Sequence, residues 1–213
     1  MQGAHGVELD VQRSADGVPI VIHDDSLERT TDGTGFVSAL RREQLGEVRA
    51  GGEPVPSLGE TVDWAREAGA FLNVEIKAAL LEEAAIAIVE RAGLLDRTIF
   101  SSFDSGIVHE VGRLAPHAHR YLLRERWDED TIAMVAEARA EGLCLRVDAA
   151  SPLALDALAR SAVPVIVWTV NEPERIRELL LAGVHGIITN TPGVAVEIAR
   201  ELGRYHPDPW NAV

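Results

Sequence analysis

The sequence contains little basic charge and almost no cysteine. Lysine and arginine together number 20, against 34 aspartate and glutamate residues, so the formal net charge is −14. Proteins that bind nucleic acid or anionic membranes need a basic face, and the composition argues against both classes. The single cysteine, Cys144, excludes an internal disulfide, and its place in the mostly apolar run 142–147 predicts a buried, unreactive thiol.

Long apolar runs are also missing. No stretch of about 18 apolar residues is present, and the N-terminus lacks the charged and apolar regions of a signal peptide. A cytoplasmic protein without stable membrane insertion is the simplest expectation. With 213 residues, of which 46% are hydrophobic, the chain can bury one core but not two independent ones. We therefore predict a single domain over residues 1–213.

Beyond residue 57, short β-branched segments alternate with longer segments rich in Ala and Leu. This alternation is typical of βα units around a parallel sheet. The predicted strands cover residues 71–77, 98–102, 119–123, 143–147, 163–170 and 185–189. The predicted helices cover residues 80–92, 105–114, 129–141, 152–161, 172–182 and 193–202. Asn171 before Glu172-Pro173 and Thr191 before Pro192 are typical helix start signals.

The N-terminal quarter of the chain does not follow this alternation. Residues 6–11 form a predicted strand, and the turn pair Asp16-Gly17 joins it to a second strand, residues 18–23, as a hairpin. Two loops and a helix follow, at residues 29–36, 51–57 and 58–68. Because residues 12–57 lie between two barrel strands, we interpret them as a loop insertion of the kind that elaborates the active face of barrel enzymes.

Counting residues 6–11, the chain has seven predicted parallel strands, whereas a closed (β/α)8 barrel has eight. The first strand also starts close to Met1, with no helix or strand before it. We therefore predict an α/β fold, a TIM (β/α)8-type barrel that lacks its first βα unit. Strands 6–11 and 185–189 would then keep unpaired edges, which favours a homo-oligomer. The tail, residues 205–213, is predicted as a surface segment.

Acidic and apolar side chains alternate in Val7-Glu8-Leu9-Asp10-Val11. In a strand, both carboxylates then point to the same face and repel each other. In a barrel that face is the packed interior or the rim of the active site, where unpaired carboxylates are costly, so the pair favours a bound cation. An exposed edge strand with polar alternation is the alternative.

The next barrel strand repeats this pattern, with Asn73, Glu75 and Lys77 on one face toward its end. Glu75 is therefore expected to join Glu8 and Asp10 at the mouth of the barrel. Three carboxylates without cysteine or paired histidine favour a hard divalent metal, Mg²⁺ or Ca²⁺. Lys77 is the only lysine among twenty basic residues. Its compact ammonium favours contact with a phosphate oxygen, and an ion pair with Glu75 is the alternative.

His23 ends an apolar run and precedes Asp24 and Asp25. Imidazole titrates near neutrality, and acidic neighbours hold its orientation and charge. With the metal cluster at the same rim, His23 is a candidate for proton transfer. The alternative is a strand-end residue with a purely structural role.

These residues belong to a series of short motifs that stand in a characteristic order. The series is Glu8-Leu9-Asp10-Val11, Asp16-Gly17-Val18-Pro19, Ile22-His23-Asp24, Arg29-Thr30-Thr31, Asp32-Gly33-Thr34-Gly35, Pro56-Ser57-Leu58, Val74-Glu75-Ile76-Lys77, Ser101-Ser102-Phe103, Trp168-Thr169-Val170-Asn171 and Gly186-Ile187-Ile188-Thr189. Each motif is weak alone, but the whole order, over nearly the entire chain, resembles that of glycerophosphodiester phosphodiesterases.

The resemblance implies a TIM barrel that hydrolyses glycerophosphodiesters to glycerol phosphate and an alcohol with the help of a divalent metal. The implied roles are metal ligand for Glu8, Asp10 and Glu75, catalysis for His23 and Lys77, and substrate contact for Lys77, Trp168 and Phe103. In the family, His23 corresponds to one of two catalytic histidines. We assign it the role of the acid that protonates the leaving alkoxide.

The sequence departs from the family pattern in three places. The His-Arg-Gly motif, which carries the other catalytic histidine, and the Pro-Glu-Asn motif are absent, and Thr189-Asn190 replaces the usual Thr-Asp. We therefore expect impaired activity of this chain. Two rival hypotheses stay open: a barrel that binds metal and phosphodiester without catalysis, and a related phospholipid phosphodiesterase. The acidic charge and the absence of an apolar membrane-binding stretch argue against the second rival.

Overall fold

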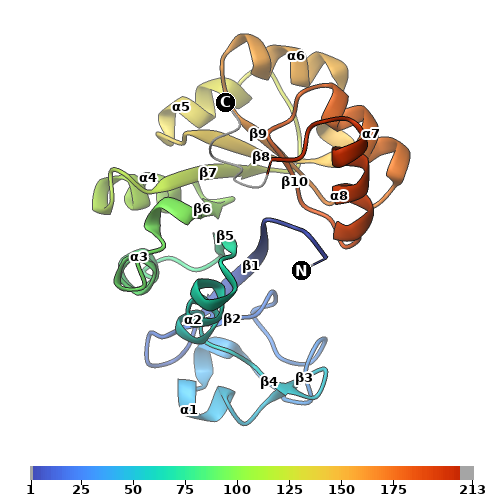
Figure 1. The fold of residues 1–213 in the computed structure, drawn as a ribbon. Coiled ribbons are helices and arrows are strands. Elements are labelled where there is room, and N and C mark those ends of the chain that lie inside the picture. The colour runs from blue at the N-terminus through green and yellow to red at the C-terminus, as the bar shows by residue number, and fades with distance from the viewer. Residues whose placement is uncertain (1, 207–213) are drawn as a thin grey trace.

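A computed structural model of the protein describes residues 2–206 and shows a curled, mostly parallel sheet with helices on its outer side (Figure 1). The sheet order is β10-β9-β8-β7-β6-β5-β1-β2, and all neighbours pair in parallel except β1 and β2. Its strands are β1 (Gly6–Arg13), β2 (Pro19–Val21), β5 (Phe71–Ile76), β6 (Thr98–Ser102), β7 (His119–Arg124), β8 (Gly142–Arg146), β9 (Val165–Trp168) and β10 (Gly186–Ile187). The predicted alternation of strands and helices is confirmed.

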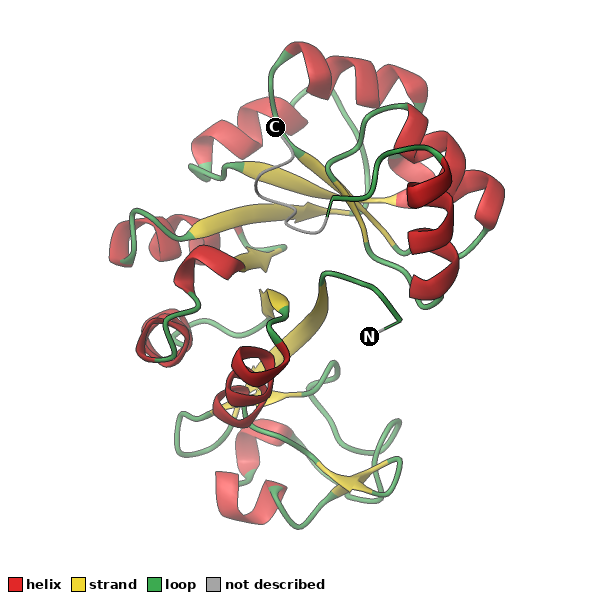
Figure 2. Cartoon of the chain, in the orientation of Figure 1, coloured by secondary structure: helices red, strands yellow, loops and turns green. Residues whose placement is uncertain are grey.

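Helices follow the parallel strands and cover the convex face of the sheet (Figure 2). They are α2 (Leu58–Ala68), α3 (Glu82–Arg91), α4 (Ser105–Leu114), α5 (Thr131–Glu137), α6 (Pro152–Arg160), α7 (Pro173–Leu181) and α8 (Pro192–Glu201). Short 3-10 helices lie at Val37–Ala39, Leu95–Arg97 and Val147–Ala149. The bounds of α2 and α4 match the predicted helices, because each begins after a side-chain cap, Ser57 or Asp104.

The sheet does not close within the described residues. Its order ends at β10 on one side, and β1 carries the short antiparallel strand β2 on the side away from β5. β10 is shorter than the predicted strand 185–189, because only Gly186 and Ile187 pair with β9. The described chain is therefore a curled half-barrel of the predicted α/β type.

The alternation of side chains in each strand separates two faces. On the convex face, Leu9, Val11 and Val74 pack into a core shared with α2 and α3. The concave face carries the polar side chains of β1 and β5 and, further along the sheet, a small apolar cluster that contains Tyr121 and Cys144. Cys144 is completely buried, so its predicted burial is confirmed. Burial also raises the pKa of its thiol, which disfavours the reactive thiolate.

The insertion, residues 12–57, is more ordered than predicted. It contains a helical turn α1 (Arg42–Leu45) and a hairpin of β3 (Arg49–Ala50) with β4 (Glu53–Pro54), where only loops were expected. Gly51 and Gly52 both have positive φ angles, of 61° and 94°, which suits a tight two-residue hairpin turn. The insertion buries its own apolar cluster, whose members include Ile20, Ile22, Leu27, Val37, Leu45 and Val55.

Asn171 does not cap the helix that follows it, contrary to the prediction. The N-cap residue of α7 is Glu172, which makes no side-chain capping bond. The Asn171 side chain instead accepts hydrogen bonds from the Asn190 backbone N–H at 2.9 Å and from the Thr189 hydroxyl at 3.3 Å, so it ties the loop after β9 to the loop after β10. Residues 207–213 of the predicted surface tail lie outside the described residues.

Candidate active site

Three carboxylates meet on the concave face. Asp10 of β1 lies directly opposite Glu75 of β5, and Glu8 lies opposite Asn73. One oxygen from each of Glu8, Asp10 and Glu75 lies within 4.8 Å of the others. Glu8 is exposed, Asp10 is half-buried and Glu75 is buried, so the cluster opens to solvent on one side.

The carboxylates disturb one another's ionisation. Although the Glu8 side chain reaches solvent, its carboxylate is partly desolvated by the groups around it on the concave face. This desolvation, followed by the charges of Asp10 and Glu75, raises the pKa of Glu8 to about 7. Burial also raises the pKa of Glu75, and the Asp10 charge adds to this effect while the Lys77 ammonium opposes it. Closely spaced negative charges of this kind gain stability from a cation between them.

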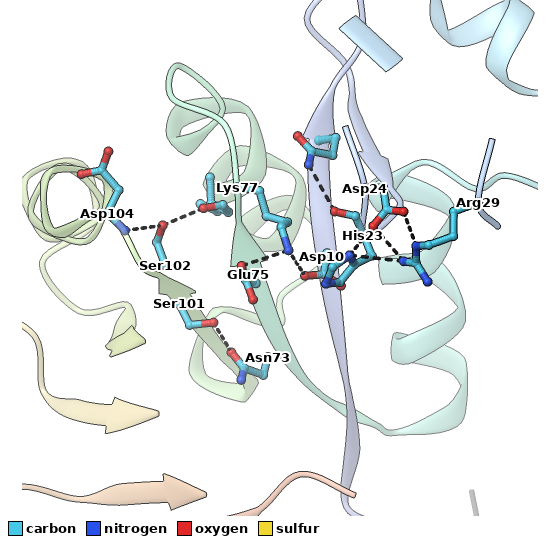
Figure 3. Close-up of polar contacts among 12 residues, drawn as sticks. Asp10, His23, Asp24, Arg29, Asn73, Glu75, Lys77, Ser101, Ser102 and Asp104 are labelled. Carbon is cyan, nitrogen blue, oxygen red and sulfur yellow. Dashed lines mark hydrogen bonds and ion pairs between the residues drawn. The ribbon is translucent and has the colours of Figure 1, made fainter. Parts of the chain in front are cut away.

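Lys77 is the positive charge that the chain itself supplies. Its Nζ atom lies 3.0 Å from Oδ1 of Asp10 and 3.4 Å from Oε1 of Glu75 (Figure 3). Burial disfavours the ammonium, but the hydrogen bond to Asp10 and the charges of Glu75 and Asp10 outweigh it, so the pKa of Lys77 is raised. Lys77 thus pairs with two carboxylates, so the alternative of an ion pair with Glu75 is present and Asp10 is added to it. The favoured role, contact with a phosphate oxygen, stays a prediction.

The donor set of this cluster suits a hard divalent cation. Glu8, Asp10 and Glu75 offer only carboxylate oxygens, and the group contains neither cysteine nor histidine. Mg²⁺ and Ca²⁺ prefer such ligands, whereas zinc and copper favour nitrogen or sulfur. With one lysine against three carboxylates, the group also keeps an excess of negative charge. The metal-ligand role of the three residues stays a prediction.

His23 lies beside this cluster because of the β1–β2 hairpin. The backbone N–H of Ile22 donates to the carbonyl oxygen of Asp10 at 3.0 Å, and the Gln12 side chain donates to the carbonyl oxygen of His23 at 3.2 Å. The His23 side chain is 61% exposed, and its Nδ1 atom lies 2.6 Å from Oδ1 of Asp24. The ring is therefore accessible to a ligand, and its polar contacts run to Asp24 and Arg29 (Figure 3).

An aromatic pair lies at the same edge of the sheet. Phe103 directly follows β6, and Trp168 ends β9. Their rings pack edge to face, with centroids 5.7 Å apart and an interplanar angle of 83°. Phe103 is 47% exposed, and the buried indole N–H of Trp168 makes no hydrogen bond within the described residues. The exposed Phe103 ring offers an apolar surface of the kind that a substrate-contacting residue requires. The substrate contact of Phe103 and Trp168 stays a prediction.

Some polar residues of the site were not assigned a role from the sequence. The Ser101 hydroxyl donates to Asn73 at 2.8 Å, and the Ser102 hydroxyl donates to the carbonyl oxygen of Ile76 at 2.7 Å, so β5 and β6 are locked together next to Glu75. Arg29 forms a forked ion pair with Asp24. Ser101, Ser102 and Arg29 each stand in one of the motifs identified in the sequence, and that was the only sign that they matter. The sequence could not show which residues they bond to, because those partners lie elsewhere in the chain.

Comparison with known proteins identifies the family of this arrangement. The model of the glycerophosphoryl diester phosphodiesterase family matches residues 1–194. The chain belongs to this family. The resemblance in the motif order and the predicted class of enzyme are therefore confirmed.

Several phosphodiesterases of this family are similar over most of their length. The glycerophosphodiester phosphodiesterase of Caldanaerobacter subterraneus subsp. tengcongensis is 31% identical, over 94% of this chain and 88% of the relative. A crystal structure of a putative family member from Silicibacter pomeroyi is 26% identical and superposes with a TM-score of 0.85, over 94% of this chain and 85% of that one. A phosphodiesterase of Oleispira antarctica, solved with its product sn-glycerol-3-phosphate, has the same fold, with 24% identity, a TM-score of 0.84, and coverage of 93% and 86%.

These likenesses confirm the predicted TIM-barrel type of fold. In the part of this chain that the structure describes, no helix is long and apolar enough to cross a membrane.

Proposed function

We propose that this phosphodiesterase hydrolyses glycerophosphodiesters to glycerol phosphate and an alcohol with Mg²⁺ or Ca²⁺ held by Glu8, Asp10 and Glu75. The observation that carries the proposal is the meeting of three carboxylates within 4.8 Å, with Lys77 bonded to two of them. Membership of the family supports the reaction class. When bound, the divalent cation would neutralise charge that builds up on the phosphodiester in the transition state.

Lys77 and His23 supply the remaining chemistry. An ammonium has three donors, so Lys77 can keep a bond to Asp10 while it donates to a phosphate oxygen. His23 has its Nδ1–H against Asp24, so as an imidazolium it can give its Nε2 proton to the leaving alkoxide and is then left as the neutral, Nδ1-protonated ring. Phe103 and Trp168 would contact the carbon atoms of the substrate through their rings.

We further propose that the 213-residue chain is a slow catalyst by itself. Among the described histidines, His23 alone belongs to the segment that is hydrogen-bonded to Asp10, through the N–H of Ile22. The others precede strands, begin β7, lie on α4 or follow α8. Acid–base help from one positioned group is typically worth about 10²- to 10⁴-fold in rate. A reaction that needs both an acid and a base would therefore lose much of its rate when only one is present.

The test separates metal binding from hydrolysis. Thermal melting is measured in EDTA and with added MgCl₂ or CaCl₂, for the wild type and Glu75→Gln. The proposal expects metal to raise the melting temperature of the wild type much more than that of the variant. Equal responses would refute the metal site.

Hydrolysis is followed as metal-dependent release of glycerol phosphate from glycerophosphocholine. The 213-residue chain is compared with a form extended at its N-terminus by a segment with the family's His-Arg-Gly and Pro-Glu-Asn motifs. We expect the extended form to be at least about 10²-fold faster. Equal rates would refute the impairment, metal binding without hydrolysis in both forms would favour a binding protein, and a preference for lysophosphatidylcholine would favour a phospholipid phosphodiesterase.

A further inference from the structure

A forked ion pair lies against the His23 ring. Arg29 donates through Nη2 to Oδ1 of Asp24 at 2.7 Å and through Nε to Oδ2 of the same carboxylate. Oδ1 of Asp24 also lies 2.6 Å from Nδ1 of His23. The three side chains thus form a continuous chain of polar contacts from the guanidinium to the imidazole (Figure 3).

The distances decide which ring nitrogen of His23 carries the proton in the neutral state. A guanidinium only donates hydrogen bonds, so an unprotonated Nδ1 would need Arg29 as its donor, yet that contact is 3.5 Å long. The much closer neighbour is the Asp24 carboxylate, and the hydrogen bonds from Arg29 and His23 hold the pKa of Asp24 well below its usual range. An ionised carboxylate can only accept, so Nδ1 carries the proton and Nε2 is left for the other side of the ring.

The segment that carries Arg29 is built to turn it back onto Asp24. The backbone N–H and the hydroxyl of Thr31 both donate to the carbonyl oxygen of Leu27, at 3.1 and 2.6 Å. The Gly33 N–H in turn donates to the Thr31 hydroxyl at 3.1 Å. Leu27 itself is completely buried in the apolar cluster of the insertion. The turn is therefore anchored to the core of the insertion. This explains why Thr31 and Gly33 closely follow Arg29 in the motifs: their hydrogen bonds hold the turn.

We propose that Asp24 and Arg29 are positioning residues that fix the orientation of His23 and keep a proton on Nδ1, so that Nε2 faces the reacting group. The imidazolium gives its Nε2 proton to the leaving alkoxide and is left as the neutral Nδ1-protonated tautomer, which the Asp24 carboxylate stabilises. This inference rests on the proposed proton-transfer role of His23. Asp24 acts on the ring directly, and Arg29 acts by holding both oxygens of Asp24. The insertion, residues 12–57, then does more than enlarge the rim: its anchored turn supplies the arginine that orients the proton donor.

The positioning role can be separated from a structural one because the pair is accessible. The side chains of His23 and Arg29 are 61% and 63% exposed, whereas that of Asp24 is 20% exposed. An ion pair with one exposed partner contributes little to stability, and Asp24→Asn keeps the shape of the less exposed side chain. The fork also requires arginine, because the single ammonium of a lysine cannot reproduce two parallel N–H donors. Arg29→Lys therefore keeps the charge and removes the geometry.

The experiment reads the His23 tautomer directly by ¹⁵N chemical shifts of the imidazole in the 213-residue chain, at a pH where the ring is neutral. The variants are Asp24→Asn, whose amide can serve either tautomer, and Arg29→Lys. The matched control is Glu110→Gln on α4, which breaks a similar fork between Glu110 and Arg113, with contacts of 2.8 and 2.6 Å. All variants should melt close to the wild type.

We expect the Nδ1-protonated form to dominate in the wild type and the control, and Asp24→Asn to contain a mixture of tautomers. In Arg29→Lys, the fraction of the Nδ1-protonated form should lie between these two. The same mixture in all four proteins would overturn the proposal. Because this readout does not depend on turnover, it stays decisive even if the chain hydrolyses no phosphodiester.

A kinetic measurement on the extended form completes the test. Asp24→Asn should lower kcat for glycerophosphocholine by roughly 10-fold or more with little change in KM, since protonation of a poor leaving group is impaired. A phosphodiester with a p-nitrophenolate leaving group needs no proton and should lose less than about threefold. Equal losses with both substrates would contradict a role in orienting the acid.

Discussion

Glu8 gives the sharpest stability prediction, because its carboxylate faces two others. In the metal-free protein we replace Glu8 with Gln, which keeps the shape of the side chain and imitates the protonated acid. The pKa of Glu8 is raised from 4.5 to about 7 by burial and by the charges of Asp10 and Glu75. Between these pH values the folded chain binds more protons than the unfolded chain, so the contribution of Glu8 to stability is present at low pH and is lost as pH rises through about 7.

The size of the effect follows from the shift in pKa. One pKa unit corresponds to 1.36 kcal/mol, so the change from 4.5 to about 7 sets a ceiling of about 3 kcal/mol at pH 8. Glu8 is exposed, and solvent screening reduces the expected gain of Glu8→Gln to about 1 kcal/mol. For a chain of this length, that gain raises the melting temperature by about 2–4 °C.

The assay is thermal unfolding followed by circular dichroism in EDTA at pH 5 and pH 8. We expect Glu8→Gln to melt above the wild type at pH 8 and together with it at pH 5. Saturating Ca²⁺ or Mg²⁺ should reverse the order, because the variant has lost a ligand. Glu67→Gln, on the exposed face of α2, is the control and should change nothing. A variant that melts with the wild type at pH 8 would refute the reasoning that the carboxylates repel one another.

Three further predictions concern the cation of the cluster, one histidine and the sheet edges. Lys77→Met should lower the free energy of unfolding of the metal-free protein at pH 8 by about 2 kcal/mol, measured by urea unfolding, because Asp10 and Glu75 lose a partly buried partner. Added Ca²⁺ should restore most of the lost stability. An unchanged free energy of unfolding would contradict the prediction. Burial lowers the pKa of His185, whose Nδ1 atom accepts from the backbone N–H of Val165, so stability should fall as pH drops below about 6.5; His185→Asn should lack this part of the pH dependence. The edge of β10 and the part of β1 before Val11, where β2 does not pair with it, should give dimers or larger species in size-exclusion chromatography with light scattering. A strictly monomeric chain would show that these edges are protected.

Much of the site could be predicted from the sequence because strand periodicity is a local property. The alternation around Glu8 and Asp10 places both carboxylates on one face whatever the rest of the chain does. The same argument applies to Glu75 and Lys77. Once the strands are assigned to a parallel sheet, their polar faces gather at one edge. The oxygen donors favour a hard divalent metal, which stays a prediction.

The same local signals were weaker in short elements. The hairpin β3–β4 and the helical turn α1 are too short to show a period, so β4 fell within a predicted loop, residues 51–57, and no element was predicted at α1 or β3. Likewise, Asn171 stands where a helix cap is common, but a competing pair of donors from the loop after β10 takes its side chain. Sequence propensity describes which local structure a segment prefers, here a helix cap at Asn171. A hydrogen bond to a distant segment can outweigh that preference.

The sequence by itself therefore determined the α/β class, the face that the carboxylates share and the chemistry they favour. Only the tertiary structure decided that Asp10 lies opposite Glu75 and that Lys77 forms ion pairs with both. It also decided that Arg29 donates hydrogen bonds to Asp24, next to His23. The physical reason is that side-chain direction within a strand is fixed by the backbone of neighbouring residues. The distance between charges on different segments is fixed by how the sheet curls and how the insertion buries its own core.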